Sequence, residues 1–545
     1  MDMLFAFVVA MTVTMALIPL LMRFAHRAQI LDRPGARKVH TAPIPRVGGI
    51  AMAAGVLLAL LLWGHFDRAL QAFCGGVLVL LVFGVWDDRS GLGPGIKLIG
   101  QMLAALIAMA WGGISIASIT LSDRLMLPGW LAAPLTFLFL IGSTNAINLS
   151  DGLDGLAGGM ALLCLGALAL LALTVGNPFV GLVALVIAGA ILGFLRFNTH
   201  PARVFMGDCG SQILGFSVAL LSVALTQDPD VPLSSALPLL LLGIPITDTL
   251  MVMTERILAG RSPFKADRNH IHHRLLALGL DHHEAVMVIY VLQAMLFIAA
   301  WSLRYQPDVV HILTFASFAA CLVAFLRIAA ARGWRWRPQR SGADEPASAG
   351  GSLAGLPPMR WLSSGSTWAI GAAMLAYGLS VLAFDPPSAG DARLLAAFVA
   401  AALGISLAMH WRRSIPNWID KAALYLTAVL AVYLDDFGGP HSRGLHWFEW
   451  VLFPLLALAV VIRLRQPHQR WLSINPLDLL VIFLAIAVPN LPGSVASPRA
   501  LGAIVAKVVL LLYGMELLSN ALDARWRWLS AGGVLFLLLC IASSA

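Results

Sequence analysis

Long apolar runs recur along the whole chain and constrain its fold more than any other feature. Up to residue 330, eleven such runs lie between charged or Pro/Gly-rich breaks. Their approximate ranges are 3–22, 48–63, 69–86, 97–111, 128–147, 156–175, 179–195, 212–226, 236–255, 285–303 and 309–328. An α-helix needs about 20 apolar residues to cross the hydrocarbon core of a bilayer. Helices pair their own backbone polar groups in lipid, and these runs lack the period-2 alternation of a membrane barrel.

Composition leads to the same fold class. Of all residues, 59% are hydrophobic and 12% are charged, whereas an average soluble domain carries roughly 25% charged residues. This difference excludes a soluble globular enzyme. The sequence therefore predicts an all-α polytopic integral membrane protein, with about 11 transmembrane helices in its first part. The five scattered cysteines form no CxxC pair and indicate neither a disulfide framework nor a zinc site.

A polar stretch rich in Gly, Pro and Ser follows the eleventh run and is typical of a flexible linker. We predict a membrane domain over residues 1–330, a cytoplasmic linker over 331–362 and a C-terminal multi-span membrane domain over 363–545. The C-terminal domain carries no motif that assigns a function. Its apolar runs, about seven in number, lie near 367–384, 392–410, 419–434, 447–462, 476–491, 500–518 and 528–543.

Basic residues predict the orientation in the membrane. The formal net charge is +8, and Lys and Arg collect in the cytoplasmic loops of membrane proteins. With the N-terminus outside, twenty Lys and Arg residues up to residue 340 are cytoplasmic, and only Arg68, Arg124 and Arg304 lie on the opposite side. The first run has no basic region or cleavage site before it, so we interpret it as a retained span. The membrane accounts for the basic charge, and we predict no nucleic-acid partner.

The polar residues of the first domain gather in five clusters, all at predicted cytoplasmic helix ends or loops. The clusters lie at 37–49, 87–88, 145–155, 198–211 and 267–274. Each alone is typical of a solvated helix end, a turn or a headgroup contact. Five clusters on one side instead favour a shared pocket. The acidic residues expected to meet there are Asp87, Asp88, Asp151, Asp154 and Asp208.

These side chains favour one kind of chemistry. Carboxylates with an asparagine suit Mg²⁺, a hard cation that prefers oxygen ligands and substrate phosphates. Basic side chains nearby suit phosphate oxygens. These basic residues are Lys38, Arg46, Arg203, Lys265 and Arg268. Such a set at the membrane surface favours phosphoryl transfer between a nucleotide-linked substrate and a lipid, in which catalysis is mainly positioning and charge stabilisation.

Four motifs also carry a family resemblance. They are Asp87-Asp88 followed by Lys97 and Gln101, Asn145-Ala-Ile-Asn148-Leu-Ser-Asp151-Gly-Leu-Asp154-Gly-Leu-Ala, Phe205-Met-Gly-Asp208-Cys-Gly-Ser211, and Asn269-His270-Ile-His272-His273-Arg274-Leu275. In order and spacing they resemble the signature blocks of the polyprenyl-phosphate N-acetylhexosamine-1-phosphate transferases (the MraY/WecA type, glycosyltransferase family 4). The resemblance covers residues 1–330. The eleven runs are similar to the undecaprenyl-phosphate GlcNAc-1-phosphate transferase branch, whereas the muramoyl enzymes have ten.

The resemblance implies a Mg²⁺-dependent phosphotransferase, with Mn²⁺ as the alternative metal. It would transfer N-acetylhexosamine-1-phosphate, with GlcNAc-1-phosphate favoured, from a UDP-sugar to undecaprenyl or another polyprenyl phosphate. The products would be polyprenyl-diphosphate-sugar and UMP. The resemblance further implies a multi-pass protein of the bacterial inner (plasma) membrane with its active site on the cytoplasmic face. It would serve the first membrane step of a cell-envelope glycan, such as lipopolysaccharide O-antigen.

The resemblance also implies roles for single residues. Asp208 and Asn148 would hold the metal, and Asp87 would deprotonate or orient the lipid phosphate. Asp88 would support the metal or the lysine network. The further catalytic candidates are Asp151 and Asp154 at the nucleoside pocket and His270, His272 and His273 near the sugar or phosphate. The candidates for nucleotide-sugar binding are Asn198, Phe205, Lys38 and Arg268, and those for lipid-phosphate binding are Lys97 and Arg46.

Several alternatives stay open. The Asn-His-Ile-His-His order at 269–273 resembles the GlcNAc branch. This resemblance favours UDP-GlcNAc over another UDP-N-acetylhexosamine, and over UDP-MurNAc-pentapeptide. A transporter or flippase for lipid-linked sugars would place its polar residues near the bilayer midplane. Direct attack is favoured over a phospho-aspartyl intermediate, because a phosphate monoester dianion is already a nucleophile. A homo-oligomer is one of the oligomeric states left open. Asp435, Asp436, His441 and His446 are interpreted as part of a solvated extracytoplasmic segment.

Overall fold

The computed structural model describes most of the first domain and parts of the second. The described residues are 2–32, 43–120, 123–262, 269–336, 357–384, 446–464 and 526–542, with parts of 396–432 and 507–518. Those up to residue 336 belong to one compact unit, and those from residue 357 onward belong to a second. Lys38, Arg268, Asp435, Asp436 and His441 lie outside the described residues.

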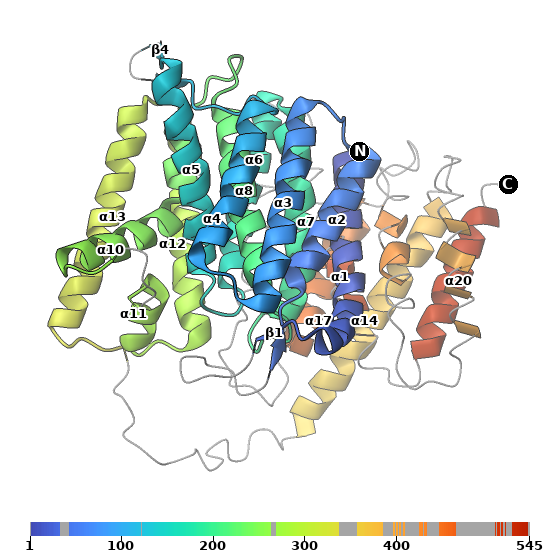
Figure 1. The fold of residues 1–545 in the computed structure, drawn as a ribbon. Coiled ribbons are helices and arrows are strands. Elements are labelled where there is room, and N and C mark those ends of the chain that lie inside the picture. Colours follow the sequence, from blue (N-terminus) through green and yellow to red (C-terminus); the bar gives the residue numbers. More distant parts are fainter. Residues whose placement is uncertain are drawn as a thin grey trace. The chain divides into compact units, whose positions relative to one another are not determined.

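The first unit is a helical bundle (Figure 1). Its helices are α1 (Asp2–Ala28), α2 (Gly48–Trp63), α3 (Arg68–Ser90), α4 (Pro94–Ala110), α5 (Gly129–Ser150), α6 (Leu156–Val175), α7 (Pro178–Asn198), α8 (Gly207–Thr226), α9 (Leu237–Leu241), α10 (Gly243–Leu258), α11 (Ile271–Ala277), α12 (His282–Leu303) and α13 (Asp308–Ala331). Among the described residues, eight helices are long and apolar enough to span a membrane. They are α1, α3, α5, α6, α7, α8, α12 and α13, whereas α2 and α4 are shorter apolar helices. The predicted all-α multi-pass membrane fold is thus confirmed.

The structure departs locally from an uninterrupted series of spans. The run predicted at 236–255 is divided at Leu242 into α9 and α10, and α10 lies at a steep angle to its neighbours (Figure 1). Two antiparallel strand pairs also occur. Their strands are β1 (Leu31–Asp32) with β2 (Ile44–Pro45), and β3 (Ser118–Thr120) with β4 (Arg124–Met126). β1 and β4 lie at opposite ends of the bundle (Figure 1).

α8 is the central helix of the first unit. Of its apolar segment, 94% is buried by protein, against 11% for α13 at the periphery. Small residues allow this close packing: a Cβ at Gly84 of α3 would lie 2.3 Å from Cα of Cys209 in α8. A Cβ at Gly49 of α2 would lie 2.3 Å from the backbone nitrogen of Gly210. Three helices therefore meet near the first turn of α8, which carries Asp208.

The second unit is described through three complete helices and shorter helical pieces. The complete helices are α14 (Pro357–Phe384), α17 (His446–Leu464) and α20 (Trp526–Ala542). α17 and α20 match the runs predicted at 447–462 and 528–543 within about two residues. α14 contains the run predicted at 367–384 but begins at Pro357, inside the segment predicted as linker, because the helix continues beyond the apolar stretch. The runs predicted at 392–410, 419–434 and 500–518 are described only in part, and the run at 476–491 lies outside the described residues.

Candidate active site

The ends of α3, α4 and α8 bring two predicted carboxylates onto one lysine. The Nζ atom of Lys97 lies 2.5 Å from Oδ2 of Asp87 and 2.5 Å from Oδ2 of Asp208. The Asp87 residue is buried, whereas the side chains of Lys97 and Asp208 are partly accessible. Two carboxylates therefore converge on one cation at a position that solvent reaches, which suits a charge-stabilising site.

A layer of amide side chains lies one helical turn deeper in the bundle. Gln101 of α4 hydrogen-bonds to Asn145 of α5, and its Nε2 atom donates to Oε1 of Gln212 of α8 at 3.2 Å. Lys97 and Asp208 each lie one turn before their partner in this layer, at i−4. Asn148 lies one turn after Asn145 on α5, which runs in the opposite direction along the bundle. The helix register therefore places Asn148 at the level of Lys97 and Asp208.

The buried Asp88 holds the start of α8 in place. Its carboxylate accepts backbone N–H bonds from Asp208 at 3.0 Å and Cys209 at 3.2 Å. Met206, the residue that precedes α8, provides no side-chain cap, so Asp88 satisfies otherwise unpaired donors of this helix and complements its dipole. Arg46 approaches within 3.8 Å of Asp88 and also pairs with Asp32. Asp88 thus holds Asp208 in place through its backbone.

Gly207 is required by this arrangement and provides a test of it. Its φ is +72°, and a Cβ at this position would lie 2.3 Å from Oδ2 of Asp88. We expect Gly207→Ala to combine a left-handed strain of about 1–2 kcal/mol with a clash of about 1–3 kcal/mol. Gly91→Ala is the matched control, because Gly91 has φ +66° but no heavy atom within 4 Å of its Cβ position. Thermal unfolding should show a larger loss for Gly207→Ala, and equal losses would contradict the assigned contact.

Asp151 and Gly152 form a turn between the carboxylate centre and the histidines. Although Asp151 keeps an exposed surface, surrounding protein desolvates its carboxylate. This desolvation and the charges of Asp208 and Asp154 raise its pKa to about 7. A Cβ at Gly152 would lie 2.2 Å from Nε2 of His272. The histidine motif therefore packs directly against the aspartate motif, as a shared pocket requires.

Asp154 and Asn198 lie in a second group, which connects the starts of α6 and α12 to the loop before α8. The Asp154 carboxylate accepts hydrogen bonds from His200 at 2.7 Å and from the backbone N–H of Ala202 at 3.1 Å. Burial raises the pKa of Asp154, but these bonds outweigh it and leave the pKa below its usual value. The ring of His282 stacks on that of His200, with centroids 4.4 Å apart.

Asn198 is buried and uses both ends of its amide on the backbone. Its Oδ1 atom accepts from Gly155 N–H at 3.0 Å, and its Nδ2 atom donates to the carbonyl of Val204 at 2.9 Å. These bonds hold the aspartate motif beside the segment that leads to Phe205. The backbone of Phe205 continues this connection, because it bonds to Pro45 and Gly48. Asn198 therefore positions two loops of the site relative to each other.

The histidine motif has an acidic partner that the sequence analysis did not single out. Oδ2 of the buried Asp248 in α10 lies 2.8 Å from Nδ1 of His270. Oδ1 of the same carboxylate accepts a hydrogen bond from the backbone N–H of Ile271 at 2.7 Å. A carboxylate only accepts, so Nδ1 of His270 carries the proton and Nε2 is the other reactive nitrogen. Asp248 lies inside an apolar run, and an intramembrane acid is a functional-site hypothesis by default. An aspartate inside an apolar run can be seen in the sequence alone, so Asp248 could have been predicted as a site residue.

His272 and His273 lie beside this pair. The rings of His270 and His272 are nearly parallel, with centroids 5.8 Å apart. The ring centroids of His272 and His273 are 4.2 Å apart. Burial and the neighbouring His273 and His270 lower the pKa of His272 to about 3. His272 is therefore neutral at physiological pH and serves as a hydrogen-bonding group instead of a cation.

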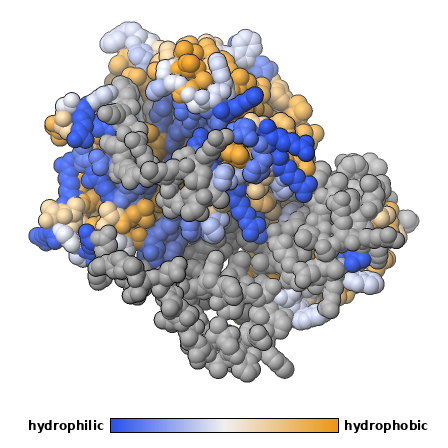
Figure 2. Space-filling model, turned by 60° about the horizontal axis from the view of Figure 1, so that its bottom comes forward, coloured by the Kyte–Doolittle hydropathy of each residue, from blue (hydrophilic) through white to orange (hydrophobic). Residues whose placement is uncertain are grey.

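All these groups occupy the end of the bundle that carries β1 and α11. Seen from that end, the first unit presents a broad hydrophilic face (Figure 2). The sides of several helices are apolar, with exposed residues such as Leu138, Leu258 and Leu313. A polar end on a bundle with apolar sides is the expected form of a site at a membrane surface.

The site fits a hard divalent cation. Lys97 already shows that the carboxylates of Asp87 and Asp208 share one cationic position. Carboxylate and amide oxygens are the donors that Mg²⁺ prefers, together with substrate phosphates. A second group is formed by Asp154, His200 and His282, whose possible ligand atoms lie within 4.8 Å of one another. The hydrogen bonds of Asp154 explain why these side chains lie together, so the group is not assigned to a metal.

This fold and this site define a multi-pass membrane protein with a carboxylate-rich centre at one end of its helices. Residues 70–226 match the family described as glycosyl transferase family 4. Over 303 residues the chain is 38% identical to a probable undecaprenyl-phosphate N-acetylglucosaminyl 1-phosphate transferase of Bacillus subtilis (strain 168), covering 55% of this chain and 84% of the relative. The chain belongs to glycosyl transferase family 4.

Two further relatives extend this comparison. The decaprenyl-phosphate N-acetylglucosaminephosphotransferase of Mycobacterium leprae (strain TN) is 34% identical over 298 residues, covering 49% of this chain and 75% of the relative. An undecaprenyl-phosphate alpha-N-acetylglucosaminyl 1-phosphate transferase of Escherichia coli (strain K12) is 28% identical over 323 residues, covering 56% and 87%. The family resemblance inferred from the motifs is thereby confirmed.

Proposed function

We propose that the protein transfers GlcNAc-1-phosphate from UDP-GlcNAc to a polyprenyl phosphate and releases UMP. The observation that carries this proposal is the Asp87–Lys97–Asp208 centre at one end of the bundle. It offers carboxylates for a metal and a cation for phosphate at the level where a lipid headgroup and a soluble nucleotide meet. The names of the relatives support the sugar and the lipid class.

In the proposed reaction, a phosphate oxygen of the lipid attacks the β-phosphorus of the UDP-sugar. The bond from that phosphorus to the bridging oxygen breaks, and UMP leaves with the electron pair. Asp208 and Asn148 would hold Mg²⁺, or Mn²⁺, which would neutralise charge on the diphosphate. Asp87 would orient or deprotonate the lipid phosphate. Lys97 lies beside the carboxylate of Asp87, and Arg46 lies near that of Asp88. Both basic side chains would attract the lipid phosphate once these carboxylates no longer pair with them.

The remaining groups would bind the donor. The Asp151–Asp154 motif and Phe205 would form the nucleoside pocket, with Asn198 holding its wall. His270, with Nε2 available, and the neutral His272 would contact the sugar phosphate beside His273. Lys38 and Arg268 are proposed as further donor-binding residues from their motifs alone. We further propose that the site faces the cytoplasm of a bacterium, where UDP-sugars are made, and serves a cell-envelope glycan.

A panel of UDP-sugars tests the proposal directly. Purified protein is mixed with polyprenyl phosphate, Mg²⁺ and UDP-GlcNAc, UDP-GalNAc or UDP-MurNAc-pentapeptide, and the nucleotide product is identified. Release of UMP with UDP-GlcNAc supports 1-phosphate transfer. Release of UDP would indicate transfer of the sugar alone, and no release with any donor would favour a carrier.

Asp248→Asn is expected to lower kcat roughly 10–100-fold, because the amide no longer fixes the proton on Nδ1 of His270. Since Asn still accepts the Ile271 N–H bond, we expect little change in stability and in KM for the UDP-sugar. The pH profile of kcat should shift as well, which a purely structural role would not cause. Asp308→Asn, a buried aspartate at the other end of the bundle, is the control. An unchanged pH profile and kcat would remove Asp248 from the site.

The first unit is expected to work without the second. A protein shortened after residue 350 should insert and release UMP with a KM for the UDP-sugar within a few-fold of the full chain, since few contacts cross a polar linker. Asp435→Ala combined with Asp436→Ala in the full chain should not change the reaction. A folded but inactive shortened protein would show that the second unit contributes to transfer.

A further inference from the structure

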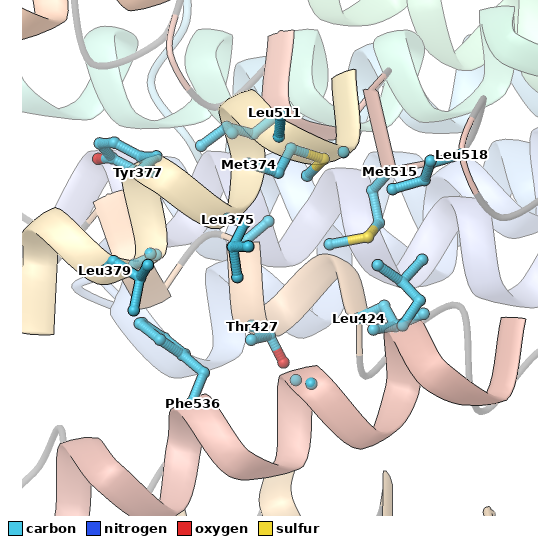
Figure 3. A pocket seen from close by; sticks show the side chains of 18 of the residues that line it. Met374, Leu375, Tyr377, Leu379, Leu424, Thr427, Leu511, Met515, Leu518 and Phe536 are labelled. Atoms are coloured by element: carbon cyan, nitrogen blue, oxygen red, sulfur yellow. The ribbon is translucent and has the colours of Figure 1, made fainter. Parts of the chain in front are cut away.

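The second unit contains a cavity that the proposed reaction does not use. Its volume is about 850 Å³, and it is lined by residues of α14 and α20 together with described residues between 424 and 431 and between 511 and 518. Figure 3 shows Leu375 and Leu379 of α14 and Phe536 of α20 around this space, with Met515 nearby. A volume of this order is typical of small-molecule sites, which span roughly 300–1,000 Å³.

The lining excludes polar ligands. Among its described residues there is no Asp, Glu, Lys, Arg or His. A nucleotide-sugar or a metal ion would find no charged partner among these residues. Water does not stably fill an apolar cavity, and an empty one loses dispersion contacts along its walls. The occupant that suits these walls is a hydrocarbon chain.

The helices that form the cavity present regular apolar faces with small residues among large ones. On α14, Gly371, Leu375 and Gly378 follow at i, i+4 and i+7, so they share one face. Large lining side chains remain accessible, including Leu375 at 66%, Trp368 at 72% and Trp528 at 74% exposed. The two glycines add no side chain to this face, so the cavity extends to the backbone of α14 there.

One lining residue, Trp528, is of a type common at the membrane surface. Trp528 lies in the first turn of α20, directly after Arg527 in the sequence. Tryptophan is enriched at membrane interfaces, and a basic residue beside a helix N-terminus attracts an anionic headgroup. The cavity therefore combines apolar walls with a tryptophan of the kind found at membrane interfaces.

We propose that this cavity binds the isoprenoid chain of a polyprenyl phosphate. The inference rests on the proposed function, because the acceptor of the first unit is a lipid of this class in the same membrane. A chain-binding site within the same polypeptide raises the effective concentration of that lipid without a new catalytic group.

Photolabelling of the full-length protein tests this assignment. The probe is a polyprenyl phosphate with a diazirine on its chain, and labelled peptides are mapped by mass spectrometry. The test variant combines Gly371→Leu with Gly378→Leu. A Cβ at either position meets only side chains, at 3.8 and 3.6 Å, and leucine favours a helix more than glycine does. The variant therefore fills the cavity without breaking α14, and thermal unfolding checks this.

In the wild type, the label should be found on peptides within 367–379 and 528–539. In the filled variant, the amount of label on these peptides should be lower by roughly tenfold or more. The matched control, Gly365→Leu, changes the same helix where no atom lies within 4 Å, and should keep the label. Unchanged labelling of the filled variant, or equal labelling by a diazirine phosphatidylglycerol, would overturn the proposal. UMP release by the same preparations reports separately on the proposed function.

Discussion

Asp208→Asn is expected to reduce turnover by at least about a hundredfold, the scale on which charge-stabilising groups act in preorganised sites. Asp208 lies in the first turn of α8, where its backbone N–H donates to the carboxylate of Asp88. Oδ2 of Asp208 lies 2.5 Å from Nζ of Lys97. Asn keeps the shape of the side chain but removes the charge that would hold Mg²⁺ on the diphosphate. The loss should therefore appear in kcat at saturating Mg²⁺, with the fold intact.

Asn148→Ala should act in the same direction, because the helix register places residue 148 at the level of Asp208. Asp230→Asn provides the control, since it makes the same chemical change at an exposed residue of another loop. If Asp208→Asn or Asn148→Ala keeps more than about a tenth of wild-type activity, the barrier has changed by less than about 1.4 kcal/mol. The metal assignment of that residue would then be wrong.

Asp87→Asn carries the second large expected effect, a loss of roughly 10²–10⁴ in the chemical step. The carboxylate of Asp87 faces Lys97 at 2.5 Å through Oδ2, while Oδ1 accepts the N–H of Leu92 at 2.6 Å. Asn can keep the second contact but not the charge. Binding of the UDP-sugar should be largely kept, because Asp87 is assigned to the lipid phosphate.

Single-turnover kinetics and equilibrium binding of UDP-GlcNAc separate these two effects. The expected pattern is a slow chemical step with a nearly unchanged dissociation constant for the UDP-sugar. Glu284→Gln, at the start of α12, is a suitable control for a lost acidic charge. A variant with wild-type kcat would exclude Asp87 from the mechanism, and weak nucleotide binding would move it to the donor pocket.

The fold class and the grouping of the polar clusters at one end of the helices could be predicted, because both depend on local sequence. Apolar length and the alternation of apolar runs with charged breaks predict membrane helices without any tertiary information. The polar clusters could be grouped because the predicted topology places them on one side. The structure joins Asp87, Lys97 and Asp208 as that grouping requires.

What could not be predicted depends on the packing between helices. No sequence period shows that Asp88 would accept the N–H groups of α8, or that both ends of the Asn198 amide would be used by backbone. The break at Leu242, which brings Asp248 to His270, is likewise a tertiary feature within one apolar run. From their motifs, Asp88 is assigned to the metal or lysine network and Asn198 to the nucleotide-sugar; the structure adds positioning contacts for both.

Transfer of the β-phosphate tests the central claim most directly. UDP-GlcNAc with a radioactive β-phosphate is mixed with the purified protein, polyprenyl phosphate and Mg²⁺, and the lipid and aqueous phases are counted. We predict label in the lipid, unlabelled UMP in equal amount in the aqueous phase, and neither product with Asp208→Asn. Label that stays in the aqueous phase, or a lipid product that carries the sugar without the label, would contradict the account.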